Sequence, residues 1–235
     1  MPTISVNMVL LNLQRRKMIV IFNGPPASGK DEAASLYKEK YGFGNLSFKY
    51  QLFKETIKHF DVDERWFMEG YNDREQKEKK EFALQGMSRR EAMIHVSEDI
   101  IKPKKGLDYF GKSVAEEIED GNNYALADGG FVEELEPIIE KVGVENIVIV
   151  QLTREGCDYS TDSRKYFNGI LIKEWAIGQT TPVDKAYVLK EEMDIVTYRV
   201  HNNGSLHNLH GALDSIHNEI FNDSSNRQVT ESSEA

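Results

Sequence analysis

The chain has 235 residues, 40% of them hydrophobic, which is enough for one domain of ordinary size with a sizeable core. Its formal net charge of −10 argues against a general nucleic-acid-binding surface, because such a surface needs a basic stripe to displace counterions. The single cysteine, Cys157, excludes an internal disulfide and fits a reducing compartment, so a cytoplasmic location is expected.

Both ends of the chain are predicted to lie outside the folded domain, which would span residues 18–222. Residues 1–17 contain an apolar run, Met8–Leu13, that is too short for a membrane span and precedes its basic residues, the reverse of a secretory signal. We interpret this segment as an N-terminal extension and expect no membrane association. Residues 223–235 are rich in Ser, Glu and Asn and are predicted to be disordered.

A glycine-containing loop near the start of the domain separates a predicted strand, Met18–Phe22, from a predicted helix, Glu32–Tyr41. Four residues separate Gly24 from Gly29, and Lys30 follows directly. This is the spacing of a phosphate-binding P-loop, in which glycines let backbone N–H groups face phosphate oxygens. The residues predicted to bind the phosphates are Gly24, Ala27, Ser28, Gly29, Lys30, Asp31 and Glu32.

Asp31 departs from the common P-loop pattern, because a Ser or Thr hydroxyl usually binds Mg²⁺ at this position. A carboxylate there can hold the ion directly or through water, and it also suits a helix N-terminus. Since it places a negative charge beside phosphates, it predicts a bound cation. The alternative is a simple helix cap.

The next segment is predicted to be mostly helical. After a short strand at Leu46–Phe48, a helix that begins at Lys49 has apolar residues at helical spacing. A charged run at residues 72–81 is typical of a solvated helix face. Within it, Arg74 and Lys77 lie one helical turn apart, which leaves a ligand-binding role open.

A second basic pair, Arg89 and Arg90, stands between Ser88 and Glu91, which form a capping box and predict a helix to about Ile101. Arginines in a first helical turn are unfavourable to the helix dipole, and this points to an anionic ligand. An ordinary surface position is the alternative. Residues 103–106 are expected to break the chain before a helix over 107–119.

Two buried strands are predicted next, at Asn123–Asp128 and Ile147–Leu152, with a helix over Val132–Val142 between them. Asp128 ends the first of these strands. Ligands of open α/β sheets bind at the carboxyl ends of the strands, so Asp128 is a candidate for orienting Mg²⁺ or a substrate. Its alternative role is to cap the following helix.

A polar loop, Thr153–Lys165, follows the second strand and carries Arg154 and Arg164. In a phosphoryl-transfer enzyme such a segment closes over the nucleotide and brings cations to the transferred group. An ordinary surface loop is the alternative. The last strand is predicted at Asp194–Val200, before an amphipathic helix whose histidines (His207, His210 and His217) are interpreted as surface residues rather than metal ligands.

These features together resemble the nucleoside monophosphate kinase family, and most closely the deoxynucleoside monophosphate kinases of tailed bacteriophages. The resemblance runs from Met18 to about Phe221 and is patchy between its motifs. The matching motifs are Ser28–Asp31, Lys49–Leu52, Ser88–Glu91 and Asn202–Leu206.

The resemblance implies a P-loop kinase fold of three α/β/α layers, with a five-stranded parallel sheet, a helical monophosphate-binding insert at about 45–120 and a lid at about 153–185. It implies ATP and Mg²⁺ as cofactors, with Asp31 and Asp128 as metal ligands, and phosphoryl transfer to a (deoxy)nucleoside monophosphate. The expected catalytic residues are Lys30, Arg154 and Arg164. The residues expected to hold the adenine of ATP are Asn203, Gly204 and Ser205, and those expected to bind the acceptor are Lys49, Arg74, Arg89, Arg90, Asp128 and Glu134.

One departure from the family pattern affects the substrate. The family has an arginine two residues after the strand-ending aspartate, and Gly130 stands there in this chain, although Asp128 and Glu134 match in place. The acceptor phosphate is then held elsewhere, or the acceptor is bulkier or altered. Alternatives are therefore another acceptor (dephospho-coenzyme A, phosphomevalonate or a modified base in phage DNA) or a nucleotide-binding module without turnover. The base, the sugar and the oligomeric state stay open, with a homodimer as one alternative.

Overall fold

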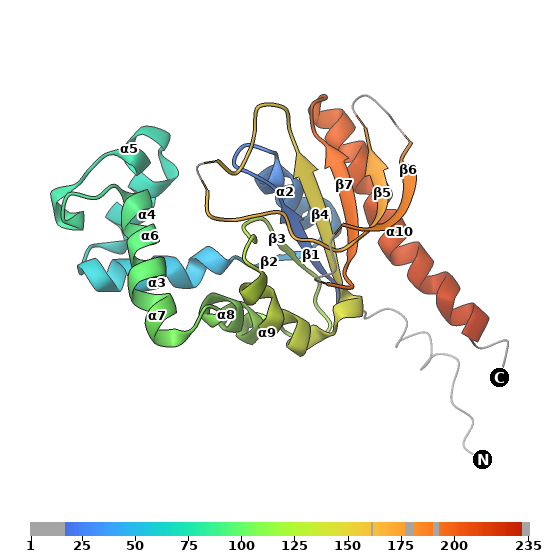
Figure 1. Ribbon diagram of the computed structural model, residues 1–235, viewed down its shortest axis with the longest axis horizontal. Helices are drawn as coiled ribbons and strands as arrows, with labels where there is room; N and C mark the ends of the chain where they lie inside the picture. The colour runs from blue at the N-terminus through green and yellow to red at the C-terminus, as the bar shows by residue number, and fades with distance from the viewer. Residues whose placement is uncertain (1–16, 161, 177–180, 190–192, 232–235) are drawn as a thin grey trace, which may run out of the picture. The chain divides into compact units, whose positions relative to one another are not determined.

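The computed structural model describes residues 17–160, 162–176, 181–189 and 193–231, and they form an α/β protein (Figure 1). The chain divides into two compact units. The first holds the described residues up to Leu46, Ile118–Phe131 and those from Val142 onward, and the second holds Ser47–Glu117 and Val132–Lys141. The predicted insert of about 45–120 has similar bounds to the first segment of the second unit.

The first unit is built on one sheet of seven strands in the order β2-β3-β1-β4-β7-β5-β6. The strands are β1 (Ile19–Asn23), β2 (Gly44–Asn45), β3 (Tyr124–Leu126), β4 (Ile147–Thr153), β5 (Ile170–Trp175), β6 (Val183–Val188) and β7 (Val196–His201). Neighbouring strands are parallel except β5 and β6, which form an antiparallel pair at one edge. The predicted α/β class is confirmed, but the sheet has seven strands and one antiparallel pair where a five-stranded parallel sheet was expected.

The two additional strands lie where the sequence predicted a lid. The predicted range of about 153–185 includes all of β5 and the start of β6, so only its first part is a loop. β5 joins the sheet through parallel pairing with β7, and its Leu171 and Trp175 are buried. The short strand predicted at Leu46–Phe48 is also displaced, since β2 precedes it and Phe48 is the first residue of a helix.

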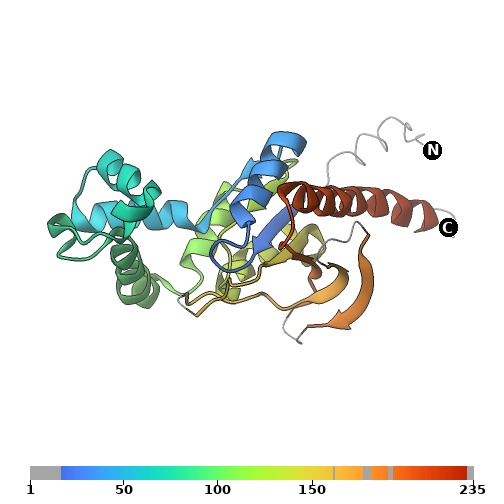
Figure 2. The same cartoon turned by 90° about the horizontal axis from the view of Figure 1, so that it is seen from above.

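One face of the sheet packs against α2 (Lys30–Tyr41) and α10 (Leu206–Glu231), which lie side by side (Figures 1 and 2). Val20 and Phe22 of β1 belong to this core together with Leu213 and Ile216 of α10. The alternating β1 residues Ile19 and Ile21 face the other way and are also fully buried. The sheet is therefore covered on both faces, as its apolar strands predict.

The second unit contains the remaining α-helices and two short irregular ones. They are α3 (Phe48–Phe60), α4 (Glu64–Asn72), α5 (Arg74–Glu78), η1 (Phe82–Leu84), α6 (Arg89–His95), η2 (Val96–Ile101), α7 (Lys102–Lys105), α8 (Tyr109–Glu117) and α9 (Val132–Val142). Phe67, Leu84, Ala92 and Met93 form its buried core. The remaining short element, η3 (Val144–Asn146), precedes β4 in the first unit.

Two predicted boundaries differ from the structure. Pro103 does not end the helix that begins at Arg89: the chain passes through a π-helical turn, η2, and continues as α7 to Gly106, whose φ of 100° ends it. A proline within a helix has no N–H to donate, and its ring clashes with the carbonyl four residues earlier; the wider π-helical turn before Pro103 accommodates both. At the end of the chain, α10 continues to Glu231, so part of the predicted disordered segment is helical.

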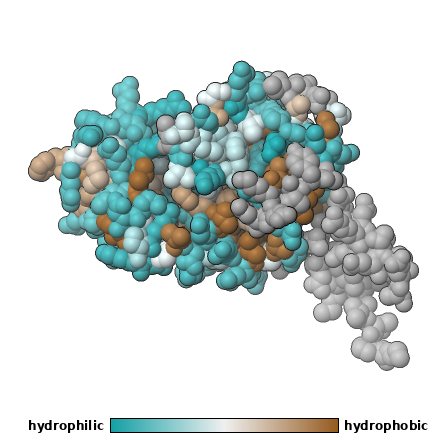
Figure 3. All heavy atoms as spheres, viewed as in Figure 1, coloured by the Kyte–Doolittle hydropathy of each residue, from teal (hydrophilic) through white to brown (hydrophobic). Residues whose placement is uncertain are grey.

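The predicted extension at residues 1–17 lies almost wholly outside the described residues, of which Lys17 is the first. Among the described residues, no helix is both long and apolar enough to cross a membrane. On the face of the molecule drawn in Figure 3, hydrophilic residues predominate and hydrophobic residues lie in small groups between them.

Candidate functional site

The loop between β1 and α2 has the backbone that its glycines predict. Gly29 has a φ of 101°, and a Cβ there would lie 2.4 Å from the side-chain nitrogen of Asn202. At Gly24, a Cβ would lie 2.4 Å from the carbonyl oxygen of Leu152 and 2.5 Å from Ser28 Oγ. Each glycine is therefore required by close approach of other atoms, and at Gly29 also by a left-handed backbone.

The N-terminus of α2 opens onto this loop. Gly29 provides no side-chain cap. The first hydrogen bond of the helix runs from the N–H of Ala33 to the carbonyl of Gly29, so the N–H groups before Ala33 take no part in the hydrogen bonds of the helix. The buried hydroxyl oxygen of Ser28 has no hydrogen-bond partner among the described residues. A buried hydroxyl without a partner and a positive helix end are what a phosphate group requires, so the loop fits a nucleotide phosphate.

Lys30, the first residue of α2, is buried. Its side chain is only 5% exposed, and Nζ donates a hydrogen bond of 2.8 Å to the carbonyl of Pro25 within the loop. The ammonium group therefore lies inside the loop, next to the backbone that would surround a phosphate. Asp31 and Glu32 are exposed in the first turn of α2, where Glu32 meets His210 at 3.0 Å.

The two predicted metal ligands lie in the first unit, Asp31 in α2 and Asp128 after β3, where Asp128 is 6% exposed. In the described part of the chain, no group of three or more His, Cys, Asp or Glu side chains could hold a metal by itself. Mg²⁺ bound with a nucleotide takes most of its ligands from phosphate and water, so one or two carboxylates suffice. The residues present therefore fit a nucleotide-bound Mg²⁺.

Asn23, at the end of β1, fixes the loop that the sequence assigned to a lid. Its buried side chain donates to the carbonyls of Gly129 (3.2 Å) and Lys165 (3.0 Å) and accepts from the N–H of Phe167 (2.7 Å). The N–H of Lys165 also donates to the carbonyl of Gly130 (3.0 Å). The described residues of 154–169, here called the arginine loop, are thus bonded to the carboxyl edge of the sheet.

The two arginines of the arginine loop have different surroundings. Arg154 is exposed, with Nη1 3.4 Å from the carbonyl of Ala27 in the P-loop. Arg164 is held by Asp162, to which its Nε donates at 2.9 Å, and its Nη1 donates at 3.3 Å to the carbonyl of Asp128. Burial alone would lower the pKa of Arg164, but its hydrogen bonds and ion pair with Asp162 raise it, so the cation is retained.

The loop after β7 is bonded to the loop between β1 and α2. Asn202 is buried, and its side-chain nitrogen donates at 3.0 Å to the carbonyl of Ser28. Asn203 accepts a hydrogen bond from the N–H of Glu155 (2.6 Å), which ties this loop to the start of the arginine loop. Ser205 accepts from the N–H of Asn208 (3.3 Å) and so caps α10.

A polar chain of Thr153, His201 and Glu174 joins the ends of β4, β7 and β5. The Nδ1 of His201 lies 2.7 Å from the Thr153 hydroxyl, and Nε2 lies 2.6 Å from a Glu174 oxygen. Partial burial acts to raise the pKa of Glu174, but the hydrogen bond from His201 and nearby positive charges outweigh it and lower the pKa. Because an ionised carboxylate only accepts, Nε2 of His201 carries a proton.

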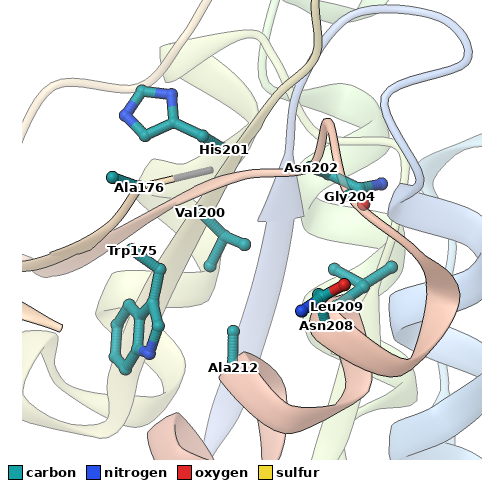
Figure 4. A pocket seen from close by; sticks show the side chains of 9 residues that line it. All are labelled: Trp175, Ala176, Val200, His201, Asn202, Gly204, Asn208, Leu209 and Ala212. Atoms are coloured by element: carbon teal, nitrogen blue, oxygen red, sulfur yellow. The ribbon is translucent and has the colours of Figure 1, made fainter. Parts of the chain in front are cut away.

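His201 also lines a small pocket between the strand ends and the first turns of α10 (Figure 4). The strand and loop side of the pocket is formed by Trp175, Ala176, Val200, His201, Asn202 and Gly204, and the helix side by Asn208, Leu209 and Ala212. Asn202 is therefore shared between this pocket and the P-loop.

The second unit holds the other predicted acceptor-binding residues, and Arg89 is the clearest correction among them. Arg89 is 1% exposed, and it donates to the backbone carbonyls of Trp66, Phe67 and Gln76. Its guanidinium lies 4.2 Å from the ring centre of Trp66, and a Cβ at Gly70 would lie 2.1 Å from its Cζ. The structure gives Arg89 a structural role in place of the predicted ligand role.

Its neighbour Arg90 is partly exposed and lies 3.8 Å from Glu78. Arg74 is exposed at the start of α5, and Lys49 is half-buried in the first turn of α3. Glu134 is buried in the first turn of α9. The capping box of Ser88 and Glu91 is confirmed, which explains why the basic pair begins a helix.

Several residues at the sheet edge were not identified from the sequence as site residues. Asn23 gives a weak signal, as a polar residue at the end of an apolar strand just before the first P-loop glycine. Glu174 and His201 give none, because they meet across strands that are distant in the chain and one of these strands was not predicted. Asp162 lies only two residues from its partner Arg164, but acidic residues are ordinary in such a polar loop. Compared with protein-family models and with curated proteins, the chain gives no match.

Proposed function

We propose that the protein transfers the γ-phosphoryl group of ATP to a (deoxy)nucleoside monophosphate, giving ADP and the diphosphate. The observation that supports it most is the loop between β1 and α2, where required glycines, the uncapped α2 N-terminus and the enclosed Lys30 ammonium group gather on a single turn. This arrangement suits the phosphates of a nucleotide.

The residues of the first unit have distinct roles in this proposal. The loop backbone and Lys30 would hold the β- and γ-phosphates, with Arg154 beside the loop and Arg164 at the neighbouring strand end. Bound Mg²⁺, held with the help of Asp31, would offset the phosphate charge. Arg74 and Arg90 of the second unit stay candidates for binding the acceptor.

Such a reaction needs no general base, since the phosphate of a monophosphate acceptor is already a nucleophile at neutral pH. Catalysis then comes from holding the two groups in line and from neutralising the charge that the transferred phosphoryl group carries. Cations supplied by Lys30, Arg154 and Arg164 meet the second requirement.

The test is an acceptor screen that measures ADP production from ATP and Mg²⁺ with each ribo- and deoxyribonucleoside monophosphate. Because Gly130 stands where the family has an arginine, the screen also includes dephospho-coenzyme A, phosphomevalonate and DNA that carries hydroxylated bases. We expect rapid turnover with at least one nucleoside monophosphate. Turnover only with another acceptor would replace the proposed substrate class, and ATP binding without ADP production would favour a non-catalytic module.

A further inference from the structure

The side chain of Arg164 lies directly against Gly130, just after the carboxyl end of β3. A Cβ built on Gly130 would lie 2.4 Å from Cβ, 2.8 Å from Cγ and 3.1 Å from Cδ of Arg164. No φ in the left-handed range accounts for this glycine, so the requirement is steric. The stem of Arg164 therefore lies where a side chain of residue 130 would begin.

The arginine loop holds this stem in place. On one side of Arg164, Asp162 binds the guanidinium at Nε and at Nη2. On the other side, Lys165 donates its N–H to the carbonyl of Gly130, and Phe167 is bonded to Asn23. The arginine is thus supported by its own loop and by the ends of β1 and β3.

Arg164 still has donors to offer. Its contacts with Asp162 and with the carbonyl of Asp128 use three of the five N–H groups of a guanidinium, and its side chain is 17% exposed. β3 and β1 are neighbouring parallel strands, about 4.8 Å apart, and the P-loop follows β1. Arg164, at the end of β3, therefore lies one strand away from the loop that suits the donor phosphates.

We propose that Arg164, positioned by Asp162 and admitted by Gly130, forms a fixed subsite for a second phosphate group at the end of β3. In this subsite a cation from the arginine loop takes the place that a side chain of residue 130 would occupy. The inference rests on the proposed function for the identity of that phosphate, the phosphate of the acceptor. Asp162 is a positioning residue, because it acts through Arg164.

A double-mutant cycle tests the steric part. The close contact involves Cβ of Arg164, so Arg164→Gly removes it whereas Arg164→Ala does not. Gly130→Ala should lower the melting temperature in the parent protein and should cost much less in the Arg164→Gly background. An equal decrease in melting temperature in both backgrounds would show that Gly130 is not required by its contact with Arg164.

Phosphate binding tests the subsite without an acceptor. The full chain is first saturated with a non-hydrolysable ATP analogue and Mg²⁺, which fills the P-loop, and inorganic phosphate is then titrated while the melting temperature is followed. Arg164→Gly should raise the half-saturating phosphate concentration about tenfold or more, the usual effect of losing charge-assisted hydrogen bonds. Asp162→Asn should raise it less, and Lys165→Ala, an exposed cation of the same loop, should leave it unchanged.

The variant that combines Gly130→Arg with Arg164→Gly moves the cation from one loop to the other. In this variant, phosphate should again raise the melting temperature at concentrations close to those of the parent protein. A purely structural role for Arg164 would not predict this recovery. A phosphate response that survives Arg164→Gly would overturn the subsite. If the response behaves as expected but the acceptor screen finds no nucleoside monophosphate, the proposed function fails and the subsite stands.

Discussion

The side chain of Asn202 donates a hydrogen bond of 3.0 Å to the carbonyl oxygen of Ser28, although 174 residues separate them. The same nitrogen lies 2.4 Å from the place of a Cβ on Gly29, so the asparagine and the glycine fit each other. The contact joins the loop after β7 to the loop between β1 and α2, the two segments that the family resemblance predicts to bind the adenine and the phosphates of one nucleotide.

Asn202→Ala should therefore weaken ATP binding about tenfold, the size expected from loss of one buried hydrogen bond that orients the P-loop. Isothermal titration with ATP and Mg²⁺ measures the change. The matched control is Asn122→Ala, an exposed asparagine that bonds only Glu119 among the described residues and should leave affinity unchanged. Equal affinity in parent and Asn202→Ala would show that the P-loop holds its shape without this contact.

Lys30→Ala should reduce turnover about 10²–10³-fold, because a positioned cation that stabilises transition-state charge contributes that much. The variant also loses the hydrogen bond to Pro25, which costs stability on the order of 1 kcal/mol and should leave the protein folded. Steady-state kinetics and a melting curve measure the two effects separately. Lys38→Ala, on the exposed side of the same helix, serves as the control, and normal turnover of Lys30→Ala would contradict the proposed function.

Arg89→Met should destabilise the second unit strongly, by about 3 kcal/mol, since it leaves buried carbonyls without donors and removes the contact with Trp66. Arg74→Ala, at an exposed position, should change the free energy of unfolding by less than about 0.5 kcal/mol. Chemical denaturation of both variants checks the contrast. If Arg89→Met were as stable as the parent and instead lost acceptor binding, the ligand role predicted from the sequence would be restored.

His217 should make the protein less stable as the pH falls below 6.5. Burial lowers its pKa from 6.5, an effect that outweighs the attraction of Asp214, and its ring stacks on Tyr41 with centres 3.5 Å apart. The unfolded chain then binds the proton at a higher pH than the folded protein does. The free energy of unfolding therefore decreases as the pH falls from 6.5 to the lower folded pKa.

Substituting His217 by Phe keeps a stacking ring and removes the proton site. The denaturation midpoint of the parent should fall further between pH 7.5 and pH 5.5 than that of His217→Phe, because all other titrating groups are common to both proteins. His207→Gln, on the exposed face of α10, should behave like the parent. Parallel pH curves for parent and His217→Phe would rule out this source of acid sensitivity.

The sequence predicted well those features that depend on neighbours in the chain. The P-loop glycines, the capping box of Ser88 and Glu91 and the apolar face of α10 each depend on spacings of a few residues. Local propensity and helical periodicity are physical properties of such short segments. For this reason the amino-acid pattern around Gly24–Lys30 is enough to predict a strand, a loop and a helix in that order.

Arg89 and Arg90 show where this reasoning stops. Both have the same charge and stand in the same helical turn, yet Arg89 is buried under Trp66 and Gly70 while Arg90 is partly exposed. Nothing in their spacing separates a structural arginine from a candidate ligand. Which of the two side chains is buried depends on which face of the helix packs against the neighbouring helices, and only tertiary packing decides that.

The amino-acid sequence by itself determined the strand, glycine-containing loop and helix around Gly24–Lys30, the α/β class and most of the helices, because each follows from residues close together in the chain. Only the tertiary structure showed that β5 and β6 extend the sheet and that the arginine loop is bonded to Asn23. It also placed Arg164 over Gly130, two residues 34 positions apart. Strand pairing and close approach of this kind depend on which distant segments share a surface, and a local pattern carries no information about that.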